Sequence, residues 1–320
     1  MWFNTLLDYG YPFSPSLILR NSGFYYFYTM FSIRHSISKI KDYASLVRFN
    51  HSIFALPFAL TGYFLAILHY NYPFEWSDIV FVIICMVLAR NTALGFNRYA
   101  DAKIDKSNPR TASREIPAGR IKPVHALLFI IINMILFVFI TWHINSLVFF
   151  LSPVALLIIT GYSFTKRFTG LSHYVLGLAL AIAPAASFLV VSARFAMLPV
   201  LLSGMVLFWT AGFDILYALQ DEDFDRKNKL FSIPVLLGRK KSLLVSAITH
   251  LISIGFLVSF GIFLKGNFIF WLGAVLFTGL LIYQHLLVTP NDISKINLAF
   301  GTLNGIASIE FAVFTILSMI

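Results

Sequence analysis

Long runs of apolar residues are the feature that most constrains how this chain can fold. Most of them reach the roughly 20 residues that an α-helix needs to cross a bilayer, and they lack the alternation of a transmembrane β-barrel. Nine runs can be marked, at about 44–70, 79–97, 123–142, 145–163, 172–192, 196–218, 241–263, 267–288 and 296–318. Pro57, Pro153 and Pro184 lie within the first, fourth and fifth runs and predict kinks there. The sequence therefore predicts an all-α polytopic membrane protein with nine transmembrane helices.

The composition agrees with a lipid environment. The chain is 58% hydrophobic and only 12% charged, whereas soluble domains are about 25% charged. Such a chain could not cover a water-soluble surface. Cys85 is the only cysteine and falls inside an apolar run, which excludes an intrachain disulfide and a thiolate metal cluster.

The basic residues are distributed unevenly between the two sides of the predicted bundle. Of the 24 Lys and Arg residues, 21 fall before the first run or in the loops after even-numbered runs, and only Arg194 and Lys265 fall on the other side. The positive-inside rule places the N-terminus and these loops in the cytoplasm and the C-terminus outside, in what we expect to be a bacterial inner membrane. The net charge of +10 is then largely a topology signal, and we expect no nucleic-acid partner.

The chain divides at about residue 38. Residues 1–38 are aromatic-rich, weakly patterned and interrupted by Pro12, Pro15 and Asn21, so we expect an N-terminal extension of unknown role. Residues 39–320 are expected to form a single transmembrane domain.

The first polar group stands at the end of the second run. Asn97, Asp101 and Asp105 are spaced four residues apart, which places them on one face of a helix. Two carboxylates one turn apart repel each other unless a cation lies between them. Carboxylate and amide oxygens are ligands for a hard divalent cation. Arg90 lies two turns earlier on the same face, within the apolar run, where an unpaired charge is costly.

A second acidic face occurs at the end of the sixth run. Asp214, Tyr217, Asp221 and Asp225 follow one another at steps of three, four and four residues, and Lys229 extends the series. Asp214 lies inside the apolar run, where placing a carboxylate costs the most free energy and most strongly indicates a functional role. Both acidic faces are thus predicted at the cytoplasmic ends of even-numbered helices.

The surrounding basic residues change the interpretation from a simple cation site to a phosphate site. Mg²⁺ is commonly held by a few carboxylates together with substrate phosphates, and Arg and Lys bind the remaining phosphate oxygens. No glycine-rich P-loop is present. A diphosphate with a lipid-soluble tail, such as a polyprenyl diphosphate, fits this combination. The basic residues concerned are Arg98, Lys103, Arg110, Arg114, Lys166, Arg167, Arg226 and Lys229.

These motifs resemble those of the UbiA superfamily of intramembrane aromatic prenyltransferases. Residues 89–121, ARNTALGFNRYADAKIDKSNPRTASREIPAGRI, are similar to its first aspartate-rich motif, and 214–225, DILYALQDEDFD, to its second. Residues 161–169, GYSFTKRFT, resemble the family's Tyr-then-Lys-Arg segment. The stretch KDYASLVRFNHSIFALPFAL, at 41–60, looks most like the 4-hydroxybenzoate branch. The resemblance covers about 40–320 and implies nine helices around a central cavity, with the active site at the cytoplasmic side.

The resemblance also implies roles for the residues above. Ionisation of a polyprenyl diphosphate would be followed by substitution on an aromatic acid, ortho to its hydroxyl. Asp101 and Asp221 are the central catalytic carboxylates, and Asp214 and Tyr217 are further candidates. One or two Mg²⁺ ions would be held by Asn97, Asp101, Asp105, Asp221 and Asp225. The diphosphate would be bound by Arg98, Arg110, Arg114, Lys166, Arg167 and Lys229. The acceptor carboxylate would be bound by Arg48 with Asn50 and His51, or by Arg90.

Alternatives remain open at this point. The acceptor could be 4-hydroxybenzoate in ubiquinone synthesis, or a futalosine-pathway acid or dihydroxynaphthoate in menaquinone synthesis. Outside the enzyme class, an ion-coupled transporter could use Asp101, Asp221 and Arg90 as a relay, although its site would be expected near the midplane. A lipid-binding protein with a degenerate site is a third reading, which the complete set of carboxylates disfavours.

Overall fold

The computed structural model describes residues 39, 41–47 and 54–320. The chain separates into two compact units, Met1–Ser45 and Leu46–Ile320. In the first unit, residues 39 and 41–45 are helical. The predicted N-terminal extension, residues 1–38, lies outside the described residues. The second unit contains helices and, among its described residues, no strand, as the sequence predicts.

Eight described helices are long and apolar enough to cross a membrane. They are α3 (Trp76–Ala100), α5 (Pro123–Ile144), α6 (Ser146–Thr165), α7 (Ser172–Ser192), α8 (Met197–Ala218), α10 (Ile233–Leu264), α11 (Phe268–Leu287) and the continuous segment of the π-helix η4 (Leu298–Leu303) and α12 (Asn304–Ser318). Two short helices, α4 (Ala102–Ser107) and α9 (Glu222–Lys227), follow α3 and α8. The all-helical membrane class is therefore confirmed.

The predicted first span corresponds to a shorter apolar helix. Within 44–70, the structure has α2 (Leu56–Phe64) followed by a π-helical turn, η3 (Leu65–His69). Pro57 lies in the first turn of α2, where a missing N–H leaves no hydrogen bond unmade. The predicted kink at Pro57 is wrong for this reason. Pro153 and Pro184 do lie inside α6 and α7.

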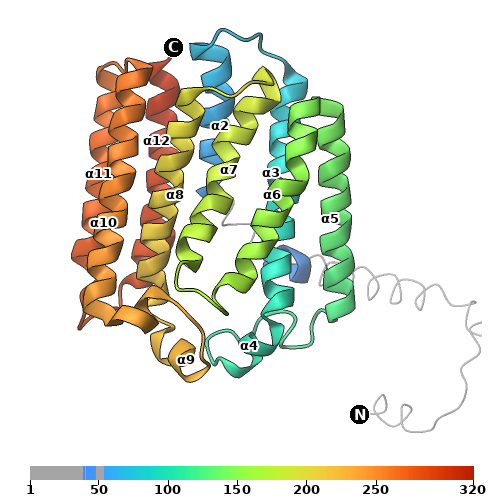
Figure 1. Ribbon diagram of the computed structural model, residues 1–320, viewed down its shortest axis with the longest axis vertical. Helices are drawn as coiled ribbons and strands as arrows, with labels where there is room; N and C mark the ends of the chain where they lie inside the picture. The colour runs from blue at the N-terminus through green and yellow to red at the C-terminus, as the bar shows by residue number, and fades with distance from the viewer. Residues whose placement is uncertain (1–38, 40, 48–53) are drawn as a thin grey trace, which may run out of the picture. The chain divides into compact units, whose positions relative to one another are not determined.

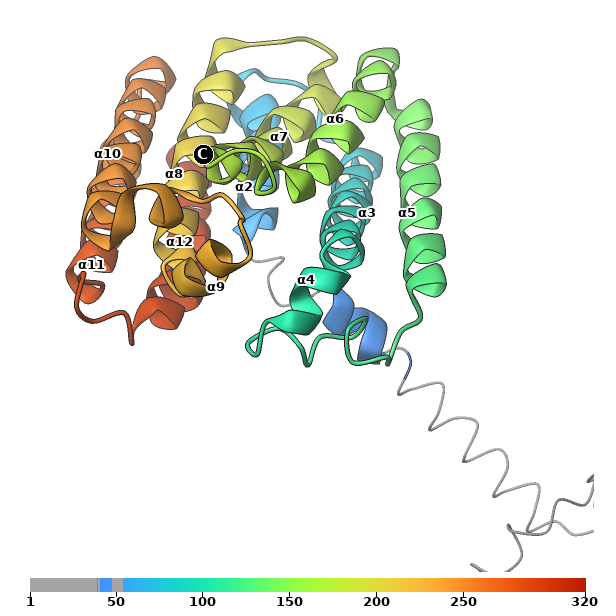
Figure 2. The same cartoon turned by 60° about the horizontal axis from the view of Figure 1, so that its bottom comes forward.

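In the second unit, each long helix packs against the next long helix in the sequence, and α12 packs back against α2. Figure 1 shows α5 beside α3, α7 beside α8, and α11 beside α12, in agreement with their contacts. Helix α2 packs against both α7 and α12 and so connects the first and last parts of the bundle. The short helices α4 and α9 lie at the same end of this unit, at the bottom of Figure 1 and at the front of Figure 2.

A buried polar cluster lies within the aromatic core between α8, α11 and α12. Asn304 accepts hydrogen bonds from the Trp209 indole nitrogen at 3.0 Å and from the Gln284 amide at 2.7 Å. Its own amide nitrogen donates to the backbone carbonyls of Ala299 and Phe300, within the π-helix, at 3.1 and 3.0 Å. Because the membrane interior offers no water to replace these partners, one side chain holds three helices and an irregular turn together.

Replacing this asparagine is expected to destabilise the bundle. Asn304→Leu keeps the number of side-chain heavy atoms and the branch at Cγ but leaves the Trp209 and Gln284 donors without an acceptor. Each buried unsatisfied group costs about 1–3 kcal/mol, while hydrogen bonds between transmembrane helices average roughly 0.6 kcal/mol. We expect the free energy of unfolding to fall by about 2 kcal/mol in an SDS titration of the solubilised protein. Ser259→Ala, at an exposed hydroxyl that bonds within its own helix, is the control, and equal effects of the two changes would contradict this account.

Candidate active site

Three loops meet at the end of the bundle that carries α4 and α9. Asn108, after α4, donates to Asp221, before α9, at 3.4 Å. The loop after α6 is the third loop at this end, because the backbone N–H of Phe231, which follows α9, donates to the Lys166 carbonyl at 2.7 Å. The two acidic motifs, more than a hundred residues apart in the chain, are thereby brought to one site (Figure 2).

The first acidic motif keeps its predicted common face across a helix break. Helix α3 ends at Ala100 and α4 begins at Ala102. The Asp101 amide nevertheless donates to the Asn97 carbonyl at 3.0 Å, and the Asp105 amide to the Asp101 carbonyl at 2.8 Å. The four-residue spacing is preserved by these bonds. The Asn97 side-chain amide donates to the Asp101 carboxylate at 3.2 Å, so both groups lie on one side.

Basic side chains neutralise these buried carboxylates. Asp101 is 1% exposed, and Lys166 Nζ lies 2.5 Å from its Oδ2. Arg167 lies 3.4 Å from its other oxygen. Asp105 is 4% exposed and pairs with one guanidinium nitrogen of Arg114, at 2.6 and 2.7 Å from its two oxygens. Buried charges are tolerated only when they are paired in this way.

The second acidic motif is organised by Arg110. Its guanidinium donates to both oxygens of Asp221, at 3.0 and 2.5 Å, and to the Tyr217 hydroxyl at 3.1 Å. The series is not one continuous helix, because α8 ends at Ala218 and α9 begins at Glu222. Tyr217 and Asp221 still share a face, since one guanidinium reaches both. Bidentate contact of this kind fixes position as well as charge.

Asp214 is engaged differently from the other acids. Its Oδ2 lies 2.7 Å from Nδ1 of His173, in the first turn of α7. His173 was not among the residues that the sequence pointed to, because a single histidine near the start of an apolar helix carries no spacing signal. Asn108 was likewise unanticipated, since its contact with Asp221 is long-range.

Asp225 carries the least compensated charge of the cluster. Burial and, next, repulsion by Asp221 raise the pKa of its carboxyl from 3.8 to about 6, against smaller lowering effects of Lys166, Arg110 and His173. A cation placed beside Asp221 and Asp225 would relieve this repulsion.

The donor set of the cluster fits Mg²⁺. Among the described residues, no group of three or more His, Cys, Asp and Glu side chains is arranged to hold a metal ion by itself. Carboxylates with an amide oxygen are nevertheless hard ligands, and Mg²⁺ usually completes its shell with water and substrate phosphate. The residues that could hold it are Asn97, Asp101, Asp105, Asp221 and Asp225.

The remaining candidates from the sequence are dispersed. Arg98 is buried in α3. Lys229 is exposed, with a left-handed backbone at φ 55°, and no described carboxylate lies within ion-pair distance of it. Arg48 and Asn50, together with His51, lie outside the described residues.

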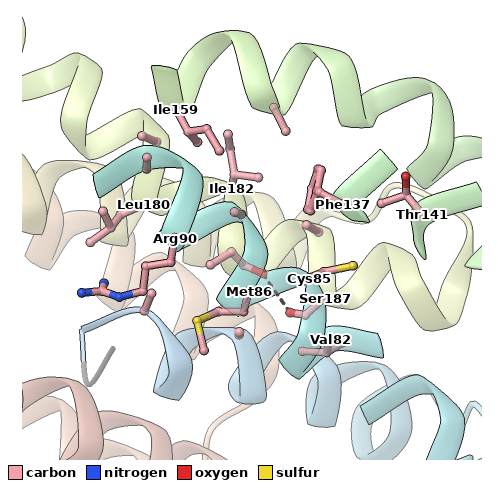
Figure 3. Close-up of a pocket in the computed structure, with 18 of the residues that line it drawn as sticks. Val82, Cys85, Met86, Arg90, Phe137, Thr141, Ile159, Leu180, Ile182 and Ser187 are labelled. Atoms are coloured by element: carbon pink, nitrogen blue, oxygen red, sulfur yellow. Dashed lines mark hydrogen bonds between the residues drawn. The ribbon is translucent and has the colours of Figure 1, made fainter. Parts of the chain in front are cut away.

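An apolar cavity of about 170 Å³ opens between α2, α3, α5, α6 and α7. Its walls are mostly alanine and aliphatic side chains, and Arg90 is the one charged residue among the described residues that line it. Figure 3 shows the guanidinium of Arg90 pointing away from the end lined by Cys85 and Thr141. Tyr162 also lines the cavity and lies one helical turn before Lys166, whose ammonium group pairs with Asp101. The cavity therefore begins beside the acidic cluster and continues into the apolar bundle.

Comparisons with known proteins agree with this geometry. Residues 55–308 match the model of the UbiA prenyltransferase family. A 4-hydroxybenzoate octaprenyltransferase of Tolumonas auensis is 32% identical over 223 residues, which cover 70% of this chain and 78% of that protein. A protein of the same name from Aliivibrio fischeri is 26% identical and covers 86% and 96%. The apo structure of a UbiA homolog from Aeropyrum pernix superposes with a TM-score of 0.76 at 28% identity, covering 84% of this chain and 98% of that one.

The raised pKa of Asp225 predicts a pH-dependent effect of removing its charge. A carboxyl with a raised folded-state pKa contributes stability that is present below its unfolded value of about 3.9 and is lost as the pH rises through about 6. Without divalent cations, Asp225→Asn is therefore expected to raise the thermal unfolding temperature relative to wild type, by an amount that grows from pH 4.5 to about 6.5. The control is Asp223→Asn, at an exposed position. A pH-independent difference for Asp225→Asn would contradict the assignment.

Proposed function

The chain belongs to the UbiA prenyltransferase family, and from this premise we propose that it transfers a polyprenyl group from a polyprenyl diphosphate to 4-hydroxybenzoate. The new bond would form ortho to the hydroxyl, in respiratory quinone biosynthesis. The observation that carries the proposal is the meeting of two acidic motifs with Arg and Lys side chains from the loops after α4 and α6. The shared name of the curated relatives supports this acceptor over the two menaquinone precursors.

The charges of the cluster suit a metal-bound diphosphate. A UbiA homolog from Archaeoglobus fulgidus, bound to GPP and Mg²⁺, has the same fold, with a TM-score of 0.65 at 21% identity. When bound, Mg²⁺ would neutralise diphosphate oxygens and so stabilise the leaving group as its C–O bond breaks. Asn97, Asp101 and Asp105 on one motif, with Asp221 and Asp225 on the other, are the proposed ligands.

The basic residues would exchange partners on substrate binding. In the structure, Arg110, Arg114 and Lys166 each neutralise an aspartate. Once those aspartates hold a cation, the same side chains are released to bind phosphate oxygens. Arg98, Arg167 and Lys229 are proposed to complete this anion site. The developing negative charge is then met by groups already in position, which is the most effective form of electrostatic catalysis.

The apolar cavity suits the prenyl tail. Its lining is aliphatic along α3 and α7, and small residues such as Ala89 and Ala183 provide the space. A dry environment protects the allylic cation from water, and Tyr162 supplies an aromatic ring to the cavity lining that could stabilise the cation. Arg90 is the described residue proposed to bind the acceptor carboxylate. Arg48 and Asn50 keep the same proposed role from the sequence.

The protein is an integral membrane protein. We propose that it resides in a bacterial inner membrane with the acidic cluster on the cytoplasmic side, as the distribution of Lys and Arg indicates. The substrates then enter from lipid and cytoplasm at one face. An ion-coupled transporter is disfavoured because the carboxylates gather at one end of the bundle, where loops meet.

Removing either central aspartate should abolish catalysis. We expect Asp101→Ala and Asp221→Ala to reduce Mg²⁺-dependent formation of prenylated 4-hydroxybenzoate at least 100-fold in purified membranes, because each change removes a proposed metal ligand and unpairs a basic residue. Asp223→Ala, which alters an exposed carboxylate in the same segment, should retain wild-type activity. Wild-type protein that releases no diphosphate with any phenolic acid would refute the proposed function, and full activity in both aspartate variants would refute the metal assignment.

Filling the cavity should restrict the enzyme to prenyl donors with shorter tails. Ala183→Phe places a ring in the cavity, and we expect turnover of an octaprenyl donor to fall at least tenfold while a two-isoprene donor is retained, since only the longer tail needs that volume. Leu157→Phe, on the outer face of α6 where the side chain is 71% exposed, is the control. Equal losses with both donors would show that the tail lies elsewhere.

A further inference from the structure

Basic residues are concentrated where α9 ends and α10 begins, in residues 226–241. This segment carries six Lys and Arg residues and no Asp or Glu. The six are Arg226, Lys227, Lys229, Arg239, Lys240 and Lys241. Because α10 bends within the segment, we call residues 226–241 the basic elbow.

The bend lies at Gly238. Its backbone, at φ 72° and ψ 168°, interrupts the helical geometry of α10 in a conformation that a residue with a Cβ rarely adopts. The turn before it begins at Ser232, whose hydroxyl accepts a hydrogen bond from the Val235 amide at 3.3 Å. This first turn of α10 therefore takes a different direction from the long part of the helix, and it lies at the end of the bundle that carries α9 (Figure 1).

A single carboxylate holds the two arms of the elbow together. Glu222 pairs with Arg226 at 2.9 Å and with Arg239 at 3.4 Å, so the end of α9 lies beside the start of the long part of α10. One carboxylate cannot neutralise so many cations. Three exposed lysines of the elbow have no described carboxylate within ion-pair distance, and these are Lys227, Lys240 and Lys241. The elbow therefore presents uncompensated positive charge.

Exposed apolar side chains accompany these lysines. Leu236 and Leu237 are exposed in the first turn of α10, and Phe231, just before it, is exposed as well. Ile233 and Pro234 of the same turn are buried, so the turn has an apolar inner face and an apolar outer face. Basic residues beside outward-facing apolar residues are typical of a segment that lies in the headgroup region of a membrane.

The elbow is also hydrogen-bonded to the loops of the acidic cluster. The Leu230 amide donates to the Asp225 carbonyl at 2.9 Å, and the Phe231 amide donates to the Lys166 carbonyl at 2.7 Å. A contact that fixes the elbow on the membrane surface would therefore also restrain the backbone of one acid and one base of the cluster.

We propose that the basic elbow is a binding site for anionic phospholipids. Lys227, Lys240 and Lys241 bind the headgroup phosphates, while Leu236 and Leu237 lie among the first acyl carbons. Each Lys near an anionic membrane surface strengthens binding about fivefold. A free phosphate or diphosphate shares the headgroup chemistry, but the exposed leucines offer such an ion nothing, and this favours the lipid. The remaining lysine of the segment is the one assigned above to the diphosphate and is not part of the lipid site.

Native mass spectrometry of the solubilised full-length protein counts bound lipids and tests the proposal. Dioleoylphosphatidylglycerol should bind at least tenfold more tightly than dioleoylphosphatidylcholine, which has the same acyl chains but no net charge. The triple variant Lys227→Gln, Lys240→Gln and Lys241→Gln should reduce this preference at least fivefold. The preference is a ratio of two affinities, so it does not depend on how much protein is folded.

The matched control removes the same charge from three exposed lysines of other connections on the predicted cytoplasmic side. Its substitutions are Lys106→Gln, Lys122→Gln and Lys295→Gln. We expect this variant to keep the wild-type preference for phosphatidylglycerol, because the lysines of the elbow are unchanged.

A double variant tests the apolar part of the site. Leu236→Ser with Leu237→Ser should weaken the binding of both lipids at least threefold, since both have the same acyl chains. The preference for phosphatidylglycerol should remain. Unchanged affinities would overturn the contact of the leucines with acyl chains.

Three further results would overturn the lipid site itself. They are equal binding of the two lipids to wild type, equal losses of preference in the elbow and control variants, and displacement of phosphatidylglycerol by inorganic diphosphate with Mg²⁺. The last result would assign the lysines to the substrate anion site. None of these measurements involves prenyl transfer, so failure of the lipid site and failure of the proposed function are separate outcomes.

Discussion

Neutralisation of buried carboxylates is the constraint on which the rest of this structure depends. Asp101 and Asp105 are almost fully buried at the end of an apolar bundle, where an unpaired charge would not remain ionised. Asp101 pairs with Lys166 from the loop after α6, and Asp105 pairs with Arg114 from the loop after α4. Arg110, from the same loop as Arg114, pairs with Asp221, which lies between α8 and α9. The ion pairs therefore do two things together: they keep the acids charged, and they hold separate segments against one another as a preformed site.

The same pairing explains how one cluster can serve both an empty and an occupied state. Carboxylates and cations neutralise each other without substrate, and both sets gain new partners when a metal-bound diphosphate arrives. The pairwise exchange costs little, since each charge of the three ion pairs keeps a partner of opposite sign in both states. Asp225, whose pKa is raised by burial and by repulsion from Asp221, is the part of the cluster that gains most from a cation.

Much of this architecture follows from the sequence alone. Apolar runs determine the spans, the asymmetry of Lys and Arg determines which loops lie together, and the four-residue spacing survives the helix break at Asp101 because backbone hydrogen bonds bridge it. The partner of each acid could not be predicted, since those contacts depend on how separate loops pack. His173 was missed for the same reason, and the kink assigned to Pro57 was wrong because the helix begins there.

The central claim is that the cluster binds metal and diphosphate as one unit, and a titration of the solubilised protein tests it most directly. Because the aspartates and the basic residues release one another, inorganic diphosphate should tighten Mg²⁺ binding at least tenfold, and Mg²⁺ should tighten diphosphate binding by the same factor. Calorimetric titration of each ligand in the absence and presence of the other measures both factors. Reciprocal tightening is the predicted result, and independent binding of the two ligands, or binding of neither, would contradict the account.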